Sequence, residues 1–351
     1  MGTGQILQCF ARAAGNATGA EARAAGAGRP MRTDTQVHAR HATMDVSTLK
    51  AAPMRILTIA LPLATALLSL GIGSGARADD ISEVPVAAAA HPFRLGNLEL
   101  AVLHDSELVV PNDGKTFGID AKPGEVAAVL RAASAPTTNI TLSVNVLMVR
   151  TAGHIALLDT GIGVADHGAL LASLKLTGVS PESVTDILIT HCHGDHIGGL
   201  LDTKGQLAFP QATIRMAGAE WDWLKMQGPA NLVAAITAHV ATFAPGATVI
   251  PGIRSRALAG HTPGHVGYEI ASGDAHLLDI GDLAHSSIVS LAKPQWMMGF
   301  DTDQTAARAT RMKTLAALAS SHELLYTPHF PYPGLGHIVA AADGFKWDPA
   351  L

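Results

Sequence analysis

Hydrophobic and polar positions along the chain follow two spacings. Aliphatic and β-branched runs with period two predict strands, whereas apolar positions three and four residues apart predict helices. Because strand-rich segments alternate with helices through both halves of the chain, we expect one α/β (α+β) domain with two mixed sheets covered by helices. The predicted strands are 98–103, 142–149, 155–158, 186–190, 212–216, 254–258, 266–270, 275–280 and 323–326. The predicted helices are 123–133, 170–176, 219–226, 229–243 and 302–320.

Other segments lack both spacings. Residues 79–95 are rich in Ala and Pro and predict an extended arm, and the turn signals at 111–114 make 105–118 a predicted loop. The chain after residue 326 is rich in Pro and Gly and predicts an irregular end. In the helix 302–320, the spacing predicts four inward-facing side chains, which are Ala306, Met312, Leu315 and Leu318.

The first 78 residues differ from the rest. Residues 1–53 are rich in Ala, Gly and Arg without sustained apolar periodicity, so we interpret them as disordered or as sequence upstream of the true start, with Met1, Met44 and Met54 as alternative initiators. Residues 54–78 combine a basic start, an apolar run over 56–72 and an Ala-Arg-Ala site, which is the pattern of a secretory signal peptide.

An uncleaved membrane anchor is the alternative interpretation of residues 54–78. The apolar run is short for a span of about 20 residues and contains Pro62 and Gly71, so cleavage before Asp79 is favoured. We therefore expect a mature hydrolase domain over 79–351, periplasmic or secreted, with no membrane attachment once the signal is removed.

Charge and cysteine content argue against a nucleic-acid partner and against an internal disulfide. The chain has 24 basic and 29 acidic residues, of which residues 1–78 hold eight and three, so 79–351 carries 16 and 26 and a formal charge of −10. That charge argues against nucleic acid as a partner. Cys9 lies in the leader, so the mature part has one cysteine, Cys192, and no internal disulfide. We expect Cys192 to be a packed residue rather than a ligand.

The candidate chemistry is concentrated at residues 191–196, His-Cys-His-Gly-Asp-His, directly after a predicted strand. Alternation along an extended chain places His191 and His193 on one side, and Asp195 and His196 follow in the turn, so the cluster can serve two metal ions. A His-rich surface loop is the simpler alternative. Three further positions on predicted loops favour the metal interpretation, and these are His265, Asp282 and His329. Imidazole with carboxylate suits zinc, and manganese, iron or cobalt are alternatives.

The sequence resembles the metallo-β-lactamase superfamily. The resemblance rests on Asp159-Thr160-Gly161, the cluster at 191–196, Gly-His-Thr-Pro-Gly-His at 260–265, Gly281-Asp282 and His329, in the family's order. It implies a four-layer αβ/βα sandwich with two divalent metal ions per chain, most simply Zn²⁺. One metal would bind His191, His193 and His265, and the second would bind Asp195, His196 and His329. Asp282 would bridge both, while Asp159 and His261 would orient ligands without touching a metal; a cap in a turn is the alternative role for His261.

Such a site implies hydrolysis by a metal-bridged hydroxide, with Asp195 and Asp282 as the catalytic carboxylates. Asp195 would also accept a proton. The acid that protonates the leaving group stays open among Tyr268, Tyr332 and His337.

A narrower resemblance is to the exported methyl parathion hydrolase-like group and its lactonase relatives. It covers most of 95–348 and includes Ser143-Val144-Asn145 and Gly334-Leu335-Gly336-His337. It implies a small apolar lactone or ester as substrate, with a phosphotriester as an alternative, and a homodimer. The candidates to line the pocket, or else to pack in the core or a dimer, are Trp223, Trp296, Met297 and Phe300. A β-lactam hydrolase and a non-catalytic metal-binding or sensor protein are the competing functions.

Overall fold

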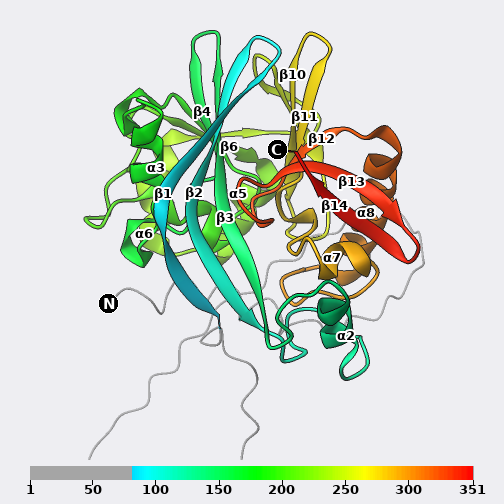
Figure 1. Cartoon of the computed structure of the whole chain (residues 1–351). Helices are drawn as coiled ribbons and strands as arrows, with labels where there is room; N and C mark the ends of the chain where they lie inside the picture. Colours follow the sequence, from blue (N-terminus) through cyan, green and yellow to red (C-terminus); the bar gives the residue numbers. More distant parts are fainter. Residues whose placement is uncertain (1–80, 351) are drawn as a thin grey trace, which may run out of the picture. The chain divides into compact units, whose positions relative to one another are not determined.

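The computed structural model describes residues 81–350, and the predicted extension (1–53) and signal peptide (54–78) lie outside the described residues. Two seven-stranded sheets form the domain, one with the order β1-β2-β3-β4-β5-β6-β7 and the other with the order β14-β13-β12-β11-β10-β9-β8. Each sheet is therefore built from one continuous half of the chain (Figure 1). Within residues 81–350, no helix combines the length and apolar character needed to cross a membrane.

The first sheet is antiparallel from β1 to β4 and parallel from β4 to β7. Apart from one helix between the antiparallel strands β2 and β3, its helices connect the parallel strands, as expected for crossover connections. The strands are β1 (Ser82–Leu95), β2 (Leu98–Pro111), β3 (Asn139–Thr151), β4 (His154–Leu158), β5 (Asp186–Leu188), β6 (Thr213–Ala217) and β7 (Val240–Phe243). The helices of this half are α2 (Glu125–Ala132), α3 (Leu170–Leu176), α4 (Gly194–Ile197), α5 (Gly218–Gln227) and α6 (Ala230–Ile236).

The second sheet is antiparallel except where β11 and β12 run parallel, joined through α8. The strands are β8 (Thr248–Ile250), β9 (Ile253–Ala257), β10 (Val266–Ser272), β11 (Ala275–Asp279), β12 (Leu324–Tyr326), β13 (Leu335–Ala341) and β14 (Gly344–Pro349). The helices of this half are α7 (Val289–Ala292) and α8 (Gln304–Ser321).

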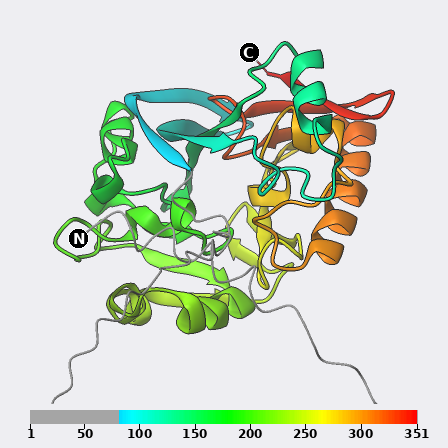
Figure 2. The ribbon, with the colours of Figure 1, turned by 90° about the horizontal axis from the view of Figure 1, so that it is seen from below.

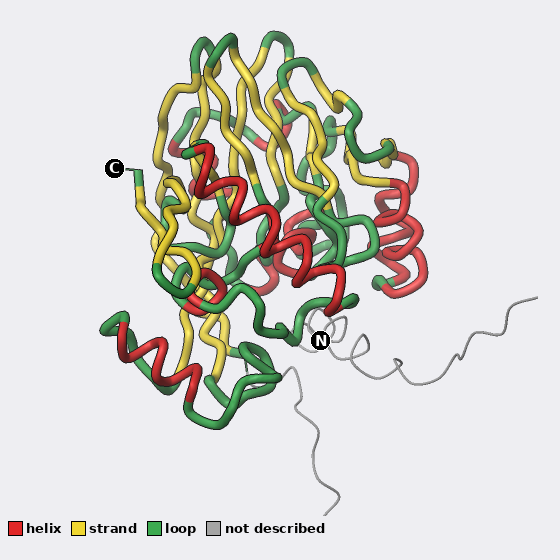
Figure 3. Tube along the Cα trace, turned by 90° about the vertical axis from the view of Figure 1, so that its right-hand side faces the viewer, coloured by secondary structure: helices red, strands yellow, loops and turns green. Residues whose placement is uncertain are grey.

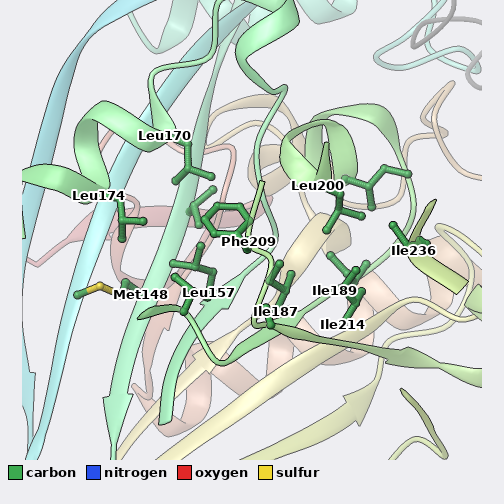
Figure 4. Packing of buried hydrophobic residues seen from close by; sticks show 14 of the residues in the cluster. Met148, Leu157, Leu170, Leu174, Ile187, Ile189, Leu200, Phe209, Ile214 and Ile236 are labelled. Carbon is green, nitrogen blue, oxygen red and sulfur yellow. The ribbon is translucent and has the colours of Figure 1, made fainter. Parts of the chain in front are cut away.

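Three of the four hydrophobic clusters in the described residues join the layers of the domain, and the fourth packs around α2. One apolar cluster joins the inner faces of the two sheets, with Leu147 and Val149 on one side and Tyr268 and Leu277 on the other. A second cluster packs the first sheet against α3, α5 and α6 (Figure 4). A third packs the second sheet against α8, which crosses its strands in Figure 3 and lies opposite α3 in Figure 2. The order helix, sheet, sheet, helix confirms the predicted four-layer αβ/βα sandwich in one domain.

Two segments predicted as arm and loop are strands instead. Residues 82–95 form β1, and β2 runs on to Pro111, so the predicted arm and much of the predicted loop pair as a long hairpin. The segment is extended, as predicted, but its pairing with β2 was not predicted from a sequence that contains Pro85 and Pro92. An edge strand tolerates proline, since its outer N–H groups have no ladder partner.

Three later predictions also need correction. The predicted helix 229–243 ends at Ile236 and returns as the parallel strand β7. In α8, Met312 is 45% exposed, whereas Arg311 is buried because its guanidinium reaches Leu283 O and Asp301. The Pro/Gly-rich end forms the hairpin β13–β14 rather than irregular structure.

Candidate metal centre

The candidate ligands come from both halves of the chain and meet at one edge of the sandwich. His191 follows β5, His193 caps the short helix α4, and that helix carries Asp195 and His196. Asp282 sits on a 3-10 helix after β11, and His329 follows β12. Loops at strand ends thus present the ligands on a rigid scaffold. All of these side chains are buried.

Three imidazole nitrogens converge in the first group. His261 Nε2 lies 2.9 Å from His193 Nδ1 and 3.2 Å from His191 Nε2, and those two nitrogens are 3.0 Å apart. Metal–nitrogen bonds of about 2.0–2.1 Å place the nitrogens of a tetrahedral site about 3.3 Å apart. With Asp282, whose Oδ2 lies 3.3 Å from His261 Nε2, the group has four donors. This spacing fits one metal ion.

The structure exchanges the roles expected for His261 and His265. His265 donates its Nδ1–H to Leu258 O, and its Nε2 accepts the N–H of Asp282, so both ring nitrogens are already used by the backbone. His261 instead turns Nε2 toward the other imidazoles and holds Asp301 with Nδ1. His261 therefore stands in the ligand group, and His265 positions the backbone of Asp282.

The second group contains Asp195, His196 and His329. His329 Nε2 lies 3.3 Å from both Asp195 Oδ2 and His196 Nε2. Asp282 lies between the two groups, because its Oδ1 is 3.2 Å from His329 Nε2 while Oδ2 faces the first group. Among the described residues, Oδ1 of Asp195 and Oδ1 of Asp282 have no hydrogen-bond partner despite burial. Buried carboxylate oxygens and converging imidazole lone pairs fit two divalent cations bridged by Asp282.

A second layer of hydrogen bonds orients the rings. Asp159 Oδ2 accepts from His196 Nδ1 at 2.8 Å, and Asp301 does the same for His261. His329 donates its Nδ1–H to Ser143 O. Because Nδ1 carries the proton in each of these contacts, the lone pair of Nε2 is directed toward the metal group. Asp159 therefore lies where the sequence suggested, whereas Asp301 was missed, since it is 40 residues from its partner.

The surroundings of the ligand side chains shift their pKa values. Burial lowers the pKa of His191 and His193 well below the usual value, which leaves their lone pairs available. Burial would also lower the pKa of His261, but hydrogen bonds and charge from Asp282 and Asp301 raise it to about 9. For Asp282, burial works against ionisation, yet the surrounding imidazoles hold its pKa well below the usual value. A cation bound at this group would compete with the proton on His261.

A cavity opens beside the second group. Its polar lining is Asp195, Asp282, His329 and His285, together with Glu83 from the N-terminal strand β1. Burial and the nearby carboxylates, Asp166 first, raise the pKa of Glu83 to about 7. The rest of the lining is apolar and consists of Ile81, Leu108, Leu142, Ile162 and Phe300.

Only one predicted pocket residue, Phe300, is among the residues that line this cavity. Trp223 packs edge-on against His193, Trp296 belongs to the cluster around α2, and the N–H of Met297 donates to Asp120. Of the four candidates, Phe300 lines this cavity, while the other three pack elsewhere, as the alternative interpretation allowed. The apolar walls instead include Leu108 of β2 and Leu142 of β3, the first in a segment predicted as a loop and the second at the start of a predicted strand.

The candidates for the leaving-group acid do not line the cavity either. Tyr268 is buried and donates to Ile189 O, and Tyr332 stacks on His104. His337 contacts the backbone at the end of α8. The residue that faces the cavity is His285, which the sequence reasoning missed although it follows Asp282 by three positions.

His285 is unusual among the buried histidines. Its Nε2 lies 3.0 Å from Asp282 Oδ2, yet neither ring nitrogen has a hydrogen bond among the described residues. Burial lowers its pKa to about 4, so the ring is neutral at physiological pH and can donate one hydrogen bond. Its stacking on His329 and its contact with Phe300 fix the ring at the boundary between the cation groups and the apolar walls.

The comparisons with known proteins agree with this geometry. The sequence model of the metallo-beta-lactamase superfamily matches residues 140–329. The structure of AidC, a dizinc quorum-quenching lactonase solved with the product N-hexnoyl-L-homoserine, is 31% identical, with a TM-score of 0.71, over 75% of this chain and 98% of that one. The hydrolase AbOPH is 27% identical, with a TM-score of 0.69, over 76% and 99%.

Matches to curated sequences are shorter. An atrochrysone carboxyl ACP thioesterase from Aspergillus fumigatus is 43% identical over 58 residues, which are 16% of this chain and 13% of the thioesterase. The uncharacterized protein YobT from Bacillus subtilis is 28% identical over 170 residues, covering 43% of this chain and 69% of YobT. These sequence matches therefore do not carry a substrate over to the whole chain.

Proposed function

The chain belongs to the metallo-β-lactamase superfamily and is a metal-dependent hydrolase with two metal-binding groups. From this premise we propose that it hydrolyses the ring of small apolar lactones, with aryl esters as secondary substrates. The observation that carries the proposal is the cavity itself: four aliphatic side chains and Phe300 share it with Asp195 and Asp282. An apolar wall beside a polar centre suits an acyl chain attached to a lactone ring. AidC, whose structure holds an acyl-homoserine product, supports the same substrate class.

The proposed ligands are His191, His193 and His261 for one metal and Asp195, His196 and His329 for the other, with Asp282 between them. Two bound divalent cations, zinc in our proposal, would acidify a water molecule and polarise the carbonyl. The protein supplies everything else. Phe300 and the aliphatic wall orient the substrate and exclude bulk water. Asp195, with its unpartnered Oδ1, accepts the proton of the attacking water.

The second half of the reaction needs a hydrogen bond to the ring oxygen. Water adds to the carbonyl carbon, the bond from that carbon to the ring oxygen breaks, and the proton held by Asp195 ends on the released alcohol. His285 lies on the cavity wall as a neutral donor, and we propose that it stabilises the carbonyl or ring oxygen during this step.

A substrate panel tests the function. The chain 79–351, loaded with zinc or manganese and assayed for metal content, is offered hexanoyl-homoserine lactone, an aryl ester, a phosphotriester and a β-lactam. The proposal expects the highest kcat/KM on the lactone. Faster β-lactam turnover would replace lactone hydrolysis by the alternative function, and two bound metals without turnover of any substrate would favour a non-catalytic binding protein. Asp222→Asn, far from the cavity lining on the exposed face of α5, is the matched active control.

We further propose export to the periplasm or the medium, on the basis of the leader sequence, and a homodimer. N-terminal sequencing of the exported protein is expected to give Asp79 as the first residue. Light scattering of that material is expected to give twice the mass of the chain. A mature protein that retains residues before 76 contradicts the cleavage proposal, and the mass of a single chain contradicts the dimer.

A further inference from the structure

One buried carboxylate outside the ligand groups joins two ligand-bearing loops. Glu220 lies in the first turn of α5 and has no solvent exposure. Its Oε1 accepts the N–H of Cys192 at 2.7 Å. Its Oε2 accepts both the hydroxyl of Thr262 and the N–H of Gly264, each at 2.8 Å.

All three donors belong to the loops that carry the histidines of the first metal group. Cys192 separates His191 from His193, and Thr262 directly follows His261. The two loops belong to different sheets, since one follows β5 and the other precedes β10. Glu220 is therefore a single carboxylate that holds the loop with two candidate ligands against the loop with the third.

Close packing fixes this arrangement further. A Cβ at Gly264 would lie 2.3 Å from Glu220 N, so the loop 260–265 rests directly on the first turn of α5. Burial raises the pKa of Glu220, while the three donors oppose that effect. A buried carboxylate held by donors on two loops resists changes in their separation, because any displacement leaves a desolvated charge without a partner.

We propose that Glu220 is a positioning residue that sets the distance from His191 and His193 to His261, and thereby the affinity of the first metal group. This inference rests on the proposed metal centre. It adds a residue that touches neither metal nor substrate and acts only on the first group. Among the described residues, the hydrogen bonds of Glu220 go to Cys192, Thr262 and Gly264 and none goes to the second group, which is Asp195, His196 and His329.

The substitution Glu220→Gln tests this role with minimal change of shape. The amide keeps one oxygen acceptor but presents an NH₂ group to one of the two loops, where N–H donors already point. One loop is thus released, and we expect cation affinity at the first group to fall 10- to 100-fold, the range typical of lost outer contacts. Glu220→Asp, which keeps the charge but is one methylene shorter, is expected to fall between Gln and the native residue.

The readout is proton NMR of the full chain titrated with cobalt(II), which shifts the ring N–H signals of coordinated histidines. His261 and His329 report on the two groups separately, through the Nδ1–H that each donates to Asp301 or to Ser143 O. In Glu220→Gln, the His261 signal is expected at higher cobalt concentration, with the His329 signal unchanged. Glu269→Gln, which changes a partly exposed strand carboxylate that pairs with Arg256, is the control.

Three outcomes separate the possible failures. If the native chain shows no shifted histidine signals, the metal centre itself is refuted. If it shows both and Glu220→Gln behaves identically, the positioning role is refuted while the centre stands. Equal weakening of both groups with a lower Tm of the metal-free protein makes Glu220 a general stabilising residue and also overturns the inference. Should Glu220→Gln fail to fold, Thr262→Val removes a single donor, and a few-fold loss confined to the His261 signal is expected.

Discussion

Asp159 offers the sharpest test of how the protein orients its metal ligands. Its Oδ1 accepts the N–H of Thr190 at 2.8 Å, and its Oδ2 accepts both the Thr190 hydroxyl and the ring N–H of His196. The Thr190 hydroxyl in turn lies 3.1 Å from His191 Nδ1. One carboxylate therefore fixes a ligand in each metal group, His191 through Thr190 and His196 directly.

The substitution Asp159→Asn isolates this function. Asp159 has φ 64°, a left-handed conformation that asparagine adopts more readily than most residues, so the backbone need not move. The amide keeps an acceptor for Thr190 N but places an NH₂ group toward His196 Nδ1. The His196 proton must then shift to Nε2, which removes the lone pair that would bind the metal. A charged hydrogen bond is worth about 1.5–3 kcal/mol.

We therefore expect the second metal to bind about 10- to 100-fold more weakly in Asp159→Asn, and the free energy of unfolding of the metal-free protein to fall by about 1.5–3 kcal/mol. Competition with a chromophoric chelator measures the affinity, and urea unfolding measures the stability. Asp186→Asn is the matched control, because Asp186 is another buried carboxylate that contacts a histidine, His154, which belongs to neither ligand group. It should lose stability without losing metal. Unchanged metal affinity in Asp159→Asn would refute the orientation argument.

Three further predictions follow from the same geometry. His285→Phe should keep both metals but lower kcat on a lactone by about 100-fold, because the cavity loses its neutral donor; equal kcat would remove His285 from the reaction. Gly199→Ala should lower the free energy of unfolding by about 1–3 kcal/mol, since its Cβ would lie 2.1 Å from Thr160 O. Gly218→Ala, whose Cβ would have no atom within 4 Å, should leave it unchanged, and thermal unfolding compares the two variants. In metal-free protein, the raised pKa of His261 contributes stability below about pH 6.5 that is lost as pH rises through about 9. The free energy of unfolding, measured with urea, should therefore fall over that interval. A stability that is constant or rises there contradicts the assignment.

The fold could be predicted wherever burial on both faces made the pattern continuous. The strands β3, β4 and β5 are almost fully buried, and their aliphatic runs identified them within a few residues. The edge strand β1 is half open to solvent and contains Pro85 and Pro92, so its sequence carries no such pattern. The strand β7 is short and only partly buried, and it continues directly from a helical segment. Edges, where tertiary pairing rather than composition decides, account for the errors.

The cavity was the least predictable part for a related reason. Its apolar walls, Leu108 and Leu142, occupy β2 and β3 and look like any other core leucines in the sequence. They line the cavity only because these strands continue to the end of the sheet that lies near α2 (Figure 1). Large aromatic side chains near the cluster were the more obvious candidates, yet Trp223 and Trp296 are used for packing.

The exchange of His261 and His265 has a physical cause that no local pattern contains. Both histidines lie in one six-residue stretch, 260–265. His265 immediately precedes β10 and lies opposite Leu258. Both of its ring nitrogens therefore form hydrogen bonds with backbone groups, Nδ1 with Leu258 O and Nε2 with the N–H of Asp282. Gly260, at φ 123°, packs against the backbone of Ala307 and directs the next residue inward. Asp301, held by Arg311 of α8, then fixes the ring of His261. The choice of ligand is therefore made by contacts with α8, 40 to 50 residues away, and it follows from the tertiary structure rather than from the motif.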